Sequence, residues 1–166
     1  MPRQPRRPRR RKEAPLVLPL LPRRRGILFP FTAGPILVGR RTSLRAVDEA
    51  TDRDLPVAVV TQRDPTLTDI TQGDLFEVAT EAQISRTLRL PDGTTQVWVQ
   101  GLRRLRVLAI EGEGPYYRAV CEPVAEPDDA SVGTEALRRA VLALFEKVCT
   151  LAPGVADDAH VMAMNI

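Results

Sequence analysis

The feature that most constrains the fold is a pair of alternating segments joined by an Asp-Gly turn. Residues 76–90 alternate between apolar and polar side chains, with a change of phase near Ser85–Arg86 that predicts one long strand with a bulge or bend. Residues 96–100 form the return strand. The intervening Asp92-Gly93 pair predicts a type I′ turn, which needs a positive φ at both central residues. The chain is therefore expected to contain an antiparallel sheet.

Short apolar runs separated by Pro and Gly predict further strands on both sides of this hairpin. These runs lie at 16–21, 27–29, 36–38, 57–60, 102–109 and 116–124. The run at 57–60 is apolar at every position, which is typical of a strand covered on both faces.

Two segments have helical spacing. Thr42 or Ser43 can cap a helix that places Leu44, Val47 and Ala50 on one face. A longer run from about 134 to 151 carries an apolar stripe opposite charged residues. The stripe consists of Leu137, Val141, Leu144, Phe145 and Val148. Asp157 and Asp158 then precede a short apolar stretch, 159–166, which predicts a helix cut off after about two turns. We therefore expect this sequence to be the N-terminal piece of a longer chain.

The formal net charge of +3 hides an uneven distribution. Residues 1–25 contain ten basic residues and one acidic residue, a charge of +9. The other 141 residues contain 14 basic and 20 acidic residues, a charge of −6. Residues 1–14 combine arginine with proline, so we expect them to form a disordered tail. The globular part is mildly acidic, which argues against nucleic-acid binding by anything but this tail.

Several classes of protein are excluded by what the sequence lacks. No apolar run approaches the roughly 18–20 residues that a transmembrane helix needs. The stretch at 14–22 is short and is broken by three prolines, which is unlike a signal peptide, so a cytoplasmic protein is expected. Cys121 and Cys149 form no CxxC pair and are expected to be buried free thiols.

Catalytic patterns are equally scarce. Neither lysine, Lys12 or Lys147, lies in a phosphate-binding loop, and the single histidine, His160, has no serine in a GxSxG setting to act with. Acidic pairs such as Asp128-Asp129 lie in turn-rich stretches, and no cluster has metal-ligand spacing. The sequence therefore predicts a binding or assembly module with no catalytic, cofactor-binding or metal-binding residues of its own.

Six short motifs occur in a particular order. They are LPLLP at 18–22, FP at 29–30, P-x-x-V-G-R at 35–40, Q-R-D-P at 62–65, D-L-F-E-V at 74–78 and L-P-D-G-T at 90–94. In this order and spacing they resemble the N-terminal substrate-recognition domain of the ATP-dependent Lon protease family, over about residues 16–166. The chain departs from the family pattern at Arg23–Arg25 and at Ala79-Thr80, and its Phe29-Pro30-Phe31 replaces an FPG or similar turn. The tail at 1–14 has no typical counterpart.

The resemblance implies an α+β fold and a role in protein quality control. A compact PUA-like six-stranded β-domain with a short helix would occupy 15–126, after the tail at 1–14, and a truncated helical subdomain would start at 127–166. The domain would bind unfolded or degron-bearing proteins for degradation. The full-length parent would be a hexameric ATP-dependent serine endopeptidase that uses ATP and Mg, while this fragment would hold neither.

Capture of unfolded polypeptide needs an exposed apolar surface with adaptable contacts. The candidate contacts are Phe29, Phe31, Pro35 and Ile36 in the first strand-and-loop region, with Leu88 near the hairpin. For each of these side chains the alternative is a place in the hydrophobic core.

Two other functions stay open from the sequence. The chain could be a free-standing binding module without protease activity, or a basic-tailed PUA-like protein that binds RNA or DNA. Continuation of the reading frame past Ile166 into a phosphate loop and a Ser-Lys dyad would distinguish the protease from the first alternative. For the second, loss of nucleic-acid retention at low salt after deletion of residues 2–14 would assign the binding to the tail alone, and retention after the deletion would assign it to the domain itself.

Overall fold

The computed structural model describes residues 14–112, 114–125, 131–152 and 163. The tail expected at 1–14, Ala14 excepted, lies outside these residues, as do Asp128-Asp129, Asp157, Asp158 and His160. The helix start expected at 159–166 also lies outside them, except for Ala163. The chain divides into two compact units, Met1–Ala125 and Glu126–Ile166.

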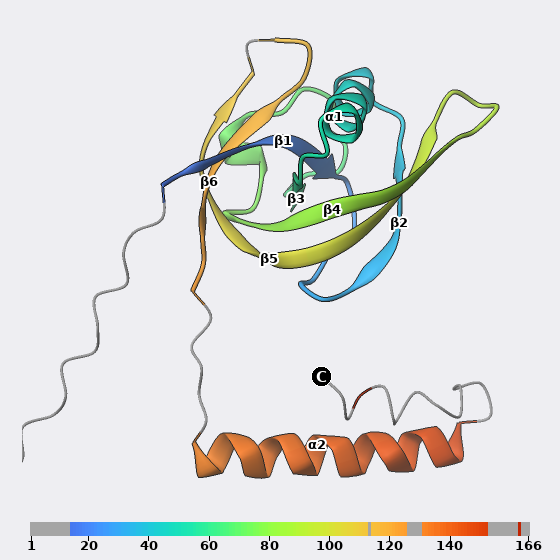
Figure 1. The fold of residues 1–166 in the computed structure, drawn as a ribbon, viewed down its shortest axis with the longest axis vertical. Helices are drawn as coiled ribbons and strands as arrows, with labels where there is room; N and C mark the ends of the chain where they lie inside the picture. Colours follow the sequence, from blue (N-terminus) through green and yellow to red (C-terminus); the bar gives the residue numbers. More distant parts are fainter. Residues whose placement is uncertain (1–13, 113, 126–130, 153–162, 164–166) are drawn as a thin grey trace, which may run out of the picture. The chain divides into compact units, whose positions relative to one another are not determined.

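The first unit is a strongly curved mixed sheet with one α-helix (Figure 1). Its described elements are β1 (Leu16–Arg23), β2 (Ala33–Val38), α1 (Arg41–Asp52), β3 (Val57–Thr61), the short 3-10 helix η1 (Gln72–Asp74), β4 (Val78–Arg89), β5 (Thr95–Glu111) and β6 (Arg118–Pro123). The strand order is β2-β5-β4-β3-β1-β6, with β1 and β3 parallel and the other pairs antiparallel. The predicted α+β class with six strands is confirmed.

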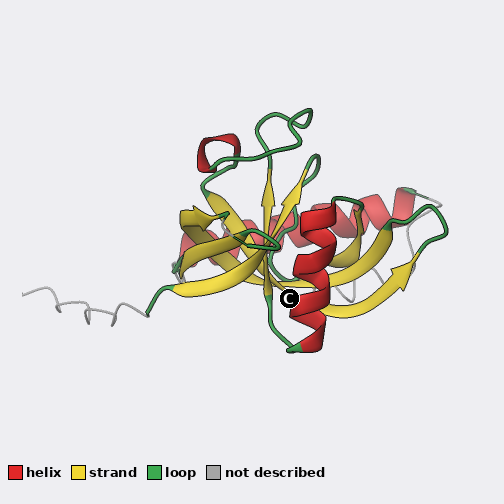
Figure 2. Cartoon of the chain, turned by 90° about the horizontal axis from the view of Figure 1, so that it is seen from above, coloured by secondary structure: helices red, strands yellow, loops and turns green. Residues whose placement is uncertain are grey.

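Strand β5 closes the sheet on itself. Its first half, 95–100, pairs with β2, and its second half, 105–111, pairs with β6, so β6 at one end of the strand order also pairs with the strand next to the other end. Figure 2 shows the resulting curvature of the strands, with α1 beside them. The sequence predicted two separate strands, at 96–100 and 102–109, and this prediction is wrong. Gly101 lies inside one continuous strand of 17 residues, where it permits a close backbone contact.

The hairpin between β4 and β5 is present, but its turn differs from the predicted type. Gly93 has a φ of 83°, whereas the φ of Asp92 is not positive. Proline fixes φ at about −65°, which suits the first central position of a type I turn. Pro91 takes this position, and the hydrogen bond from Gly93 N to Leu90 O (3.1 Å) closes the turn. Gly93 then takes the left-handed position of a G1 bulge. The predicted bulge in β4 is confirmed by the register shift between Ile84 and Arg86, where Ser85 is the extra residue.

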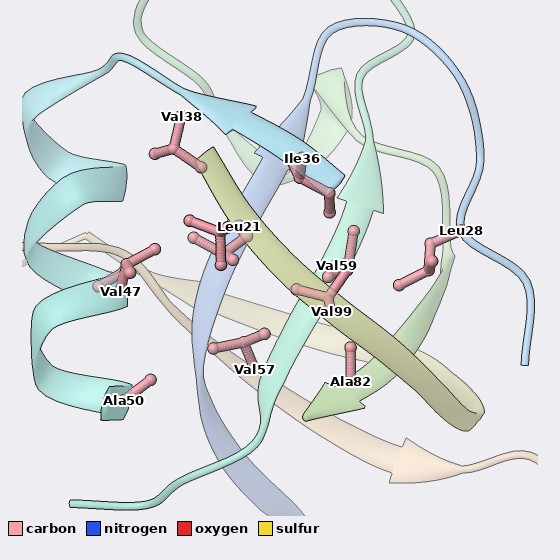
Figure 3. Close-up of a cluster of buried hydrophobic side chains, with 12 residues drawn as sticks. Leu21, Leu28, Ile36, Val38, Val47, Ala50, Val57, Val59, Ala82 and Val99 are labelled. Carbon is pink, nitrogen blue, oxygen red and sulfur yellow. The ribbon is translucent and has the colours of Figure 1, made fainter. Parts of the chain in front are cut away.

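Two clusters of buried apolar side chains fill the first unit, and β3 contributes to both. Val57 and Val59 lie in the cluster beneath α1, while Ala58 and Val60 lie in the cluster toward β6. This confirms that β3 is covered on both faces. Figure 3 shows Val47 and Ala50 of α1 in the first cluster, near the strands.

The start of α1 and one predicted strand need correction. The first helical bond runs from Leu44 N to Arg40 O (2.9 Å), so the helix begins at Arg41, before Thr42 and Ser43, and Arg40 caps it without a side-chain hydrogen bond. The strand predicted at 27–29 is a loop. Few of its backbone groups form hydrogen bonds with the neighbouring strands.

The second unit contains α2 (Val132–Leu151). Ser131 caps it by accepting a hydrogen bond from Thr134 N (3.2 Å), so the helix starts two residues before the predicted position. Of its predicted stripe, Leu137, Val141, Leu144 and Val148 are exposed, and Phe145 is partly exposed.

The two cysteines differ in their environment. Cys121 on β6 is fully buried, and burial, followed by the nearby charge of Glu81, raises the pKa of its thiol to about 11. Cys149 on α2 is only partly buried, so the expectation of two buried thiols holds for one of them.

We predict that alkylation at neutral pH modifies Cys149 and spares Cys121 in the folded protein. Thiolate is the reactive form, and a thiol with a pKa of about 11 and no exposed surface carries little thiolate at neutral pH. Mass spectrometry of proteolytic peptides after brief iodoacetamide treatment measures both sites. Denaturant should make the two cysteines equally reactive, and equal labelling without denaturant would contradict the structure.

Candidate functional site

A loop between β1 and β2 is held against β4 and β5 by three hydrogen bonds. Phe31 N donates to Gly101 O (2.9 Å), Gly101 N donates to Thr32 O (2.8 Å), and Thr80 Oγ1 donates to Leu28 O (2.6 Å). The contact is so close that a Cβ on Gly101 would lie 2.3 Å from the Phe29 carbonyl oxygen. Only glycine fits at this point of β5 without a backbone shift.

This loop contains a turn that displays an aromatic side chain in an unfavourable conformation. Thr32 N (3.3 Å) and Thr32 Oγ1 (2.7 Å) both donate to Phe29 O, and Pro30 and Phe31 take the two central positions of a type II turn. Phe31 has a φ of 63°, a conformation that glycine usually supplies and that costs an L residue about 1–2 kcal/mol. Its side chain is nevertheless 76% exposed. Because Phe31 is strained and yet not buried, its position points to a function other than stabilising the fold.

An apolar groove lies between this loop and the start of β4. We define the groove by its lining residues: Ile27, Leu28, Phe29, Pro30, Thr61, Phe76, Val78, Thr80 and Arg104, around a cavity of about 250 Å³. Four large apolar side chains of the lining are roughly half exposed or more, namely Ile27 (64%), Phe29 (53%), Phe76 (46%) and Val78 (52%). They come from two segments almost fifty residues apart in the sequence.

The D-L-F-E-V motif positions the second wall of the groove. Asp74 accepts hydrogen bonds from Thr71 N (2.8 Å) and Thr71 Oγ1 (2.7 Å) in a capping box, and these bonds lower the pKa of Asp74. Leu75 is buried in the core, so the next residue, Phe76, faces outward. The guanidinium of Arg63 lies 4.8 Å from the centre of the Phe76 ring, an arrangement that holds the ring by a cation–π contact.

The residues that the sequence predicted as substrate contacts lie in different parts of the structure. Phe29 lines the groove, and Phe31 lies in the adjoining turn. Pro35 and Leu88 are exposed on the outer face of β2, β5 and β4, where Pro35 is aligned with Trp98. Ile36 is only 6% exposed and belongs to the core cluster beneath α1. Its expected contact role is therefore corrected, because alternation along β2 turns its side chain inward.

Sequence reasoning missed Ile27, Phe76 and Val78 as surface residues. Phe76 and Val78 were placed in the same alternating series as Ala82, which is buried. Burial actually becomes continuous from Ala79 to Ala82 because both faces of β4 are covered there. Two large apolar residues just before a fully covered stretch were the signal that could have identified them.

A curved β-domain with an open apolar groove belongs to the class of binding domains, and the fold is shared with solved members of one group. The N terminal domain of Mycobacterium avium complex Lon protease matches with a TM-score of 0.67 at 20% identity, over 91% of this chain and 76% of that one. A Lon N-terminal domain protein from Xanthomonas campestris matches with a TM-score of 0.58 at 18% identity, over 89% of this chain and 88% of that one.

Residues 17–166 match the family described as the ATP-dependent protease La (LON) substrate-binding domain, and the chain belongs to this family. It is 35% identical to the Lon protease of Dictyoglomus thermophilum and 38% identical to Lon protease 2 of Herpetosiphon aurantiacus, over 93% and 91% of this chain. These alignments cover 19% and 18% of the two relatives, so the chain spans about a fifth of their length.

Two other kinds of feature are absent from the described part of the chain. No helix there is long and apolar enough to cross a membrane. The same residues contain no group of three or more His, Cys, Asp or Glu side chains placed to hold a metal ion.

We predict that Gly101→Ala lowers the free energy of unfolding by about 2–3 kcal/mol, because the new methyl group would overlap the Phe29 carbonyl oxygen and force a backbone shift. Urea denaturation measures the change. Gly34→Ala in β2 is the matched control, since no atom lies within 4 Å of its added Cβ. Equal effects of the two substitutions would contradict the close contact at Gly101.

Phe31→Gly is predicted to raise the free energy of unfolding by up to about 1 kcal/mol, because glycine accepts the positive φ of this turn position without steric cost. Phe31→Ala removes the same ring but keeps the strain, so it should give no such gain. Thermal or urea denaturation of both variants provides the comparison. A Phe31→Gly variant that is no more stable than Phe31→Ala would show that the turn is not strained.

Proposed function

We propose that the apolar groove captures apolar side chains of unfolded or degron-bearing polypeptides and so recruits substrates to an ATP-dependent serine protease. The observation that carries this proposal is the exposure of four large apolar side chains around a single cavity. Clustered exposure of this kind is costly in water and usually marks an interaction surface. The family to which the chain belongs is named for substrate binding, which supports the same function.

The size of the groove favours a polypeptide over a small-molecule ligand. Its volume of about 250 Å³ is below the range of about 300–1,000 Å³ that is typical of small-molecule sites. A shallow apolar cavity can accept one side chain after another from chains of different sequence, since its contacts are not directional. The strained, exposed Phe31 beside the groove would add an aromatic contact for such chains.

We further propose that residues 15–126 form the binding domain and that 127–166 begin a helical subdomain of a longer cytoplasmic protein. The parent would assemble as a hexamer and would degrade the captured proteins. The sequence given has no phosphate-binding loop that fits ATP and Mg, so both would be bound by residues that follow Ile166. Sequencing of the gene beyond this point tests the continuation.

We predict that Phe29→Ser and Phe76→Ser each raise the Kd for an unfolded test protein about tenfold, because each removes one aromatic wall of the groove. A reduced, carboxymethylated protein labelled with a fluorophore serves as the test ligand in anisotropy titrations. Circular dichroism and thermal denaturation establish that each variant is folded. Both side chains are about half exposed, so their loss should have little effect on stability.

Leu88→Ser is the matched control, because Leu88 is similarly exposed (43%) but lies on the outer face of the sheet, away from the groove lining. Leu88 and Pro35 stay predicted contacts until this comparison is made. If Leu88→Ser alone weakened binding, the capturing surface would be the outer face of the sheet. If all three variants bound like the unmodified protein, the proposed function would be wrong.

A further inference from the structure

A second cavity, of about 520 Å³, lies where the end of β1 and the end of β2 meet the first turn of α1. Four arginines line it, Arg23, Arg24, Arg25 and Arg40, and none of its lining residues is acidic. We call it the arginine pocket. Its positive charge stands out because residues 26–166 carry 20 acidic and 14 basic side chains.

The charges of this pocket are poorly neutralised by the protein itself. Among the described residues, no acidic side chain forms an ion pair with Arg23, Arg24 or Arg25. The adjacent α1 begins without a side-chain cap and without an acidic residue in its first turn, so its N-terminus adds positive potential. An anion in the pocket would meet several uncompensated donors at once.

Arg40 is held in place by hydrogen bonds to a segment that is far from it in the sequence. Its Nη2 donates to Gln62 Oε1 (2.5 Å) and to Leu67 O (3.0 Å), which joins the P-x-x-V-G-R segment to the Q-R-D-P segment. Its Nη1 is buried and has no hydrogen-bond partner among the described residues. Burial, followed by the positive charge of Arg24, lowers the pKa of Arg40, while Tyr117 and Asp69 have smaller effects in the opposite direction.

The arginine pocket and the apolar groove adjoin. Arg25 lines the pocket and Ile27 lines the groove, so Gly26 alone separates the two linings along the chain. The Cα atoms of Arg25 and Ile27 can be no more than about 7 Å apart, the reach of two residues. The guanidinium of Arg23 lies against this glycine, with Nη2 3.3 Å from the position that a Cβ would take. A polypeptide lying in the groove can therefore reach the pocket with a side chain a few residues away.

Guanidinium groups suit two kinds of anion, carboxylate and phosphate. The lining favours the carboxylates of a polypeptide, because it contains no aromatic side chain on which a nucleic-acid base could stack. It does contain apolar wall residues that continue the surface available to a peptide, such as Leu37 and Pro22. We propose that the arginine pocket binds the Asp or Glu side chains of a substrate polypeptide that lie within about three residues of an apolar side chain held in the groove. This inference rests on the proposed function and adds a charge preference to it.

The test compares two fluorescent peptides that carry the same apolar residues and differ only in flanking Glu or Gln. Anisotropy titrations of the full 166-residue chain give both Kd values at low salt. We expect the Glu peptide to bind about tenfold more tightly, because charge-assisted hydrogen bonds to guanidinium are strong. The double variant Arg24→Gln/Arg25→Gln should abolish this preference and leave the Kd of the Gln peptide unchanged.

The matched control is Arg45→Gln/Arg86→Gln, which removes the same charge from exposed residues outside the pocket lining and should keep the preference. The arginines at 3–11 are present in every variant, so their attraction for the Glu peptide does not differ between variants. A preference that survives Arg24→Gln/Arg25→Gln would overturn the inference and leave the proposed function standing. Displacement of the Glu peptide by a short single-stranded oligonucleotide at equal concentration would assign the pocket to phosphate and also overturn it. Failure of both peptides to bind the unmodified protein would contradict the proposed function itself.

Discussion

The close approach of two backbones at Gly101 is the constraint on which the candidate site depends. Because β5 has no side chain at this position, the loop at 28–32 can lie directly on it and form hydrogen bonds with both the N–H and the C=O of the glycine. Strand β5 continues through this position and pairs with β2 at one end and with β6 at the other. The missing Cβ thus lets the loop that carries Phe29 lie against the closed sheet, where Phe29 and Phe76 line the same groove.

Much of the fold could be predicted because it follows from short-range patterns. Local patterns in the sequence indicate which side chains are buried. Examples are the apolar run at 57–60, the phase change near Ser85 and the helical spacing around Val47. The errors occur where long-range contacts override such patterns. The run at 27–29 is strand-like in composition, yet it forms no ladder with a neighbouring strand and is held by the side chain of Thr80 on β4, which donates to Leu28 O. The type I′ turn was wrong because the Pro91 ring restricts the turn, whatever the following Asp-Gly pair prefers.

The candidate site was harder to predict than the fold, since the sequence does not state which apolar residues are left uncovered. Of the predicted contacts, Phe29 lines the groove, whereas Ile36 has similar hydrophobicity and lies in the core. The difference is set by the sheet: β2 alternates, so that Pro35 and Leu37 face outward while Ile36 faces inward. Phe76 and Val78 join Phe29 only through the closed sheet, which brings the start of β4 next to the loop at 27–30. No pattern local to either segment contains that pairing.

The structure also changes the interpretation of how charge is distributed along the chain. By sequence, Arg23, Arg24 and Arg25 were counted with the basic residues of the N-terminal segment. In the structure Arg23 ends β1, and all three line a pocket of the domain together with Arg40. The backbone that carries these charges is therefore part of the folded domain, with Arg24 and Arg25 directly after the end of β1. Four arginines close to an apolar groove can select among polypeptides, because only a chain that places a carboxylate near an apolar side chain gains both kinds of contact.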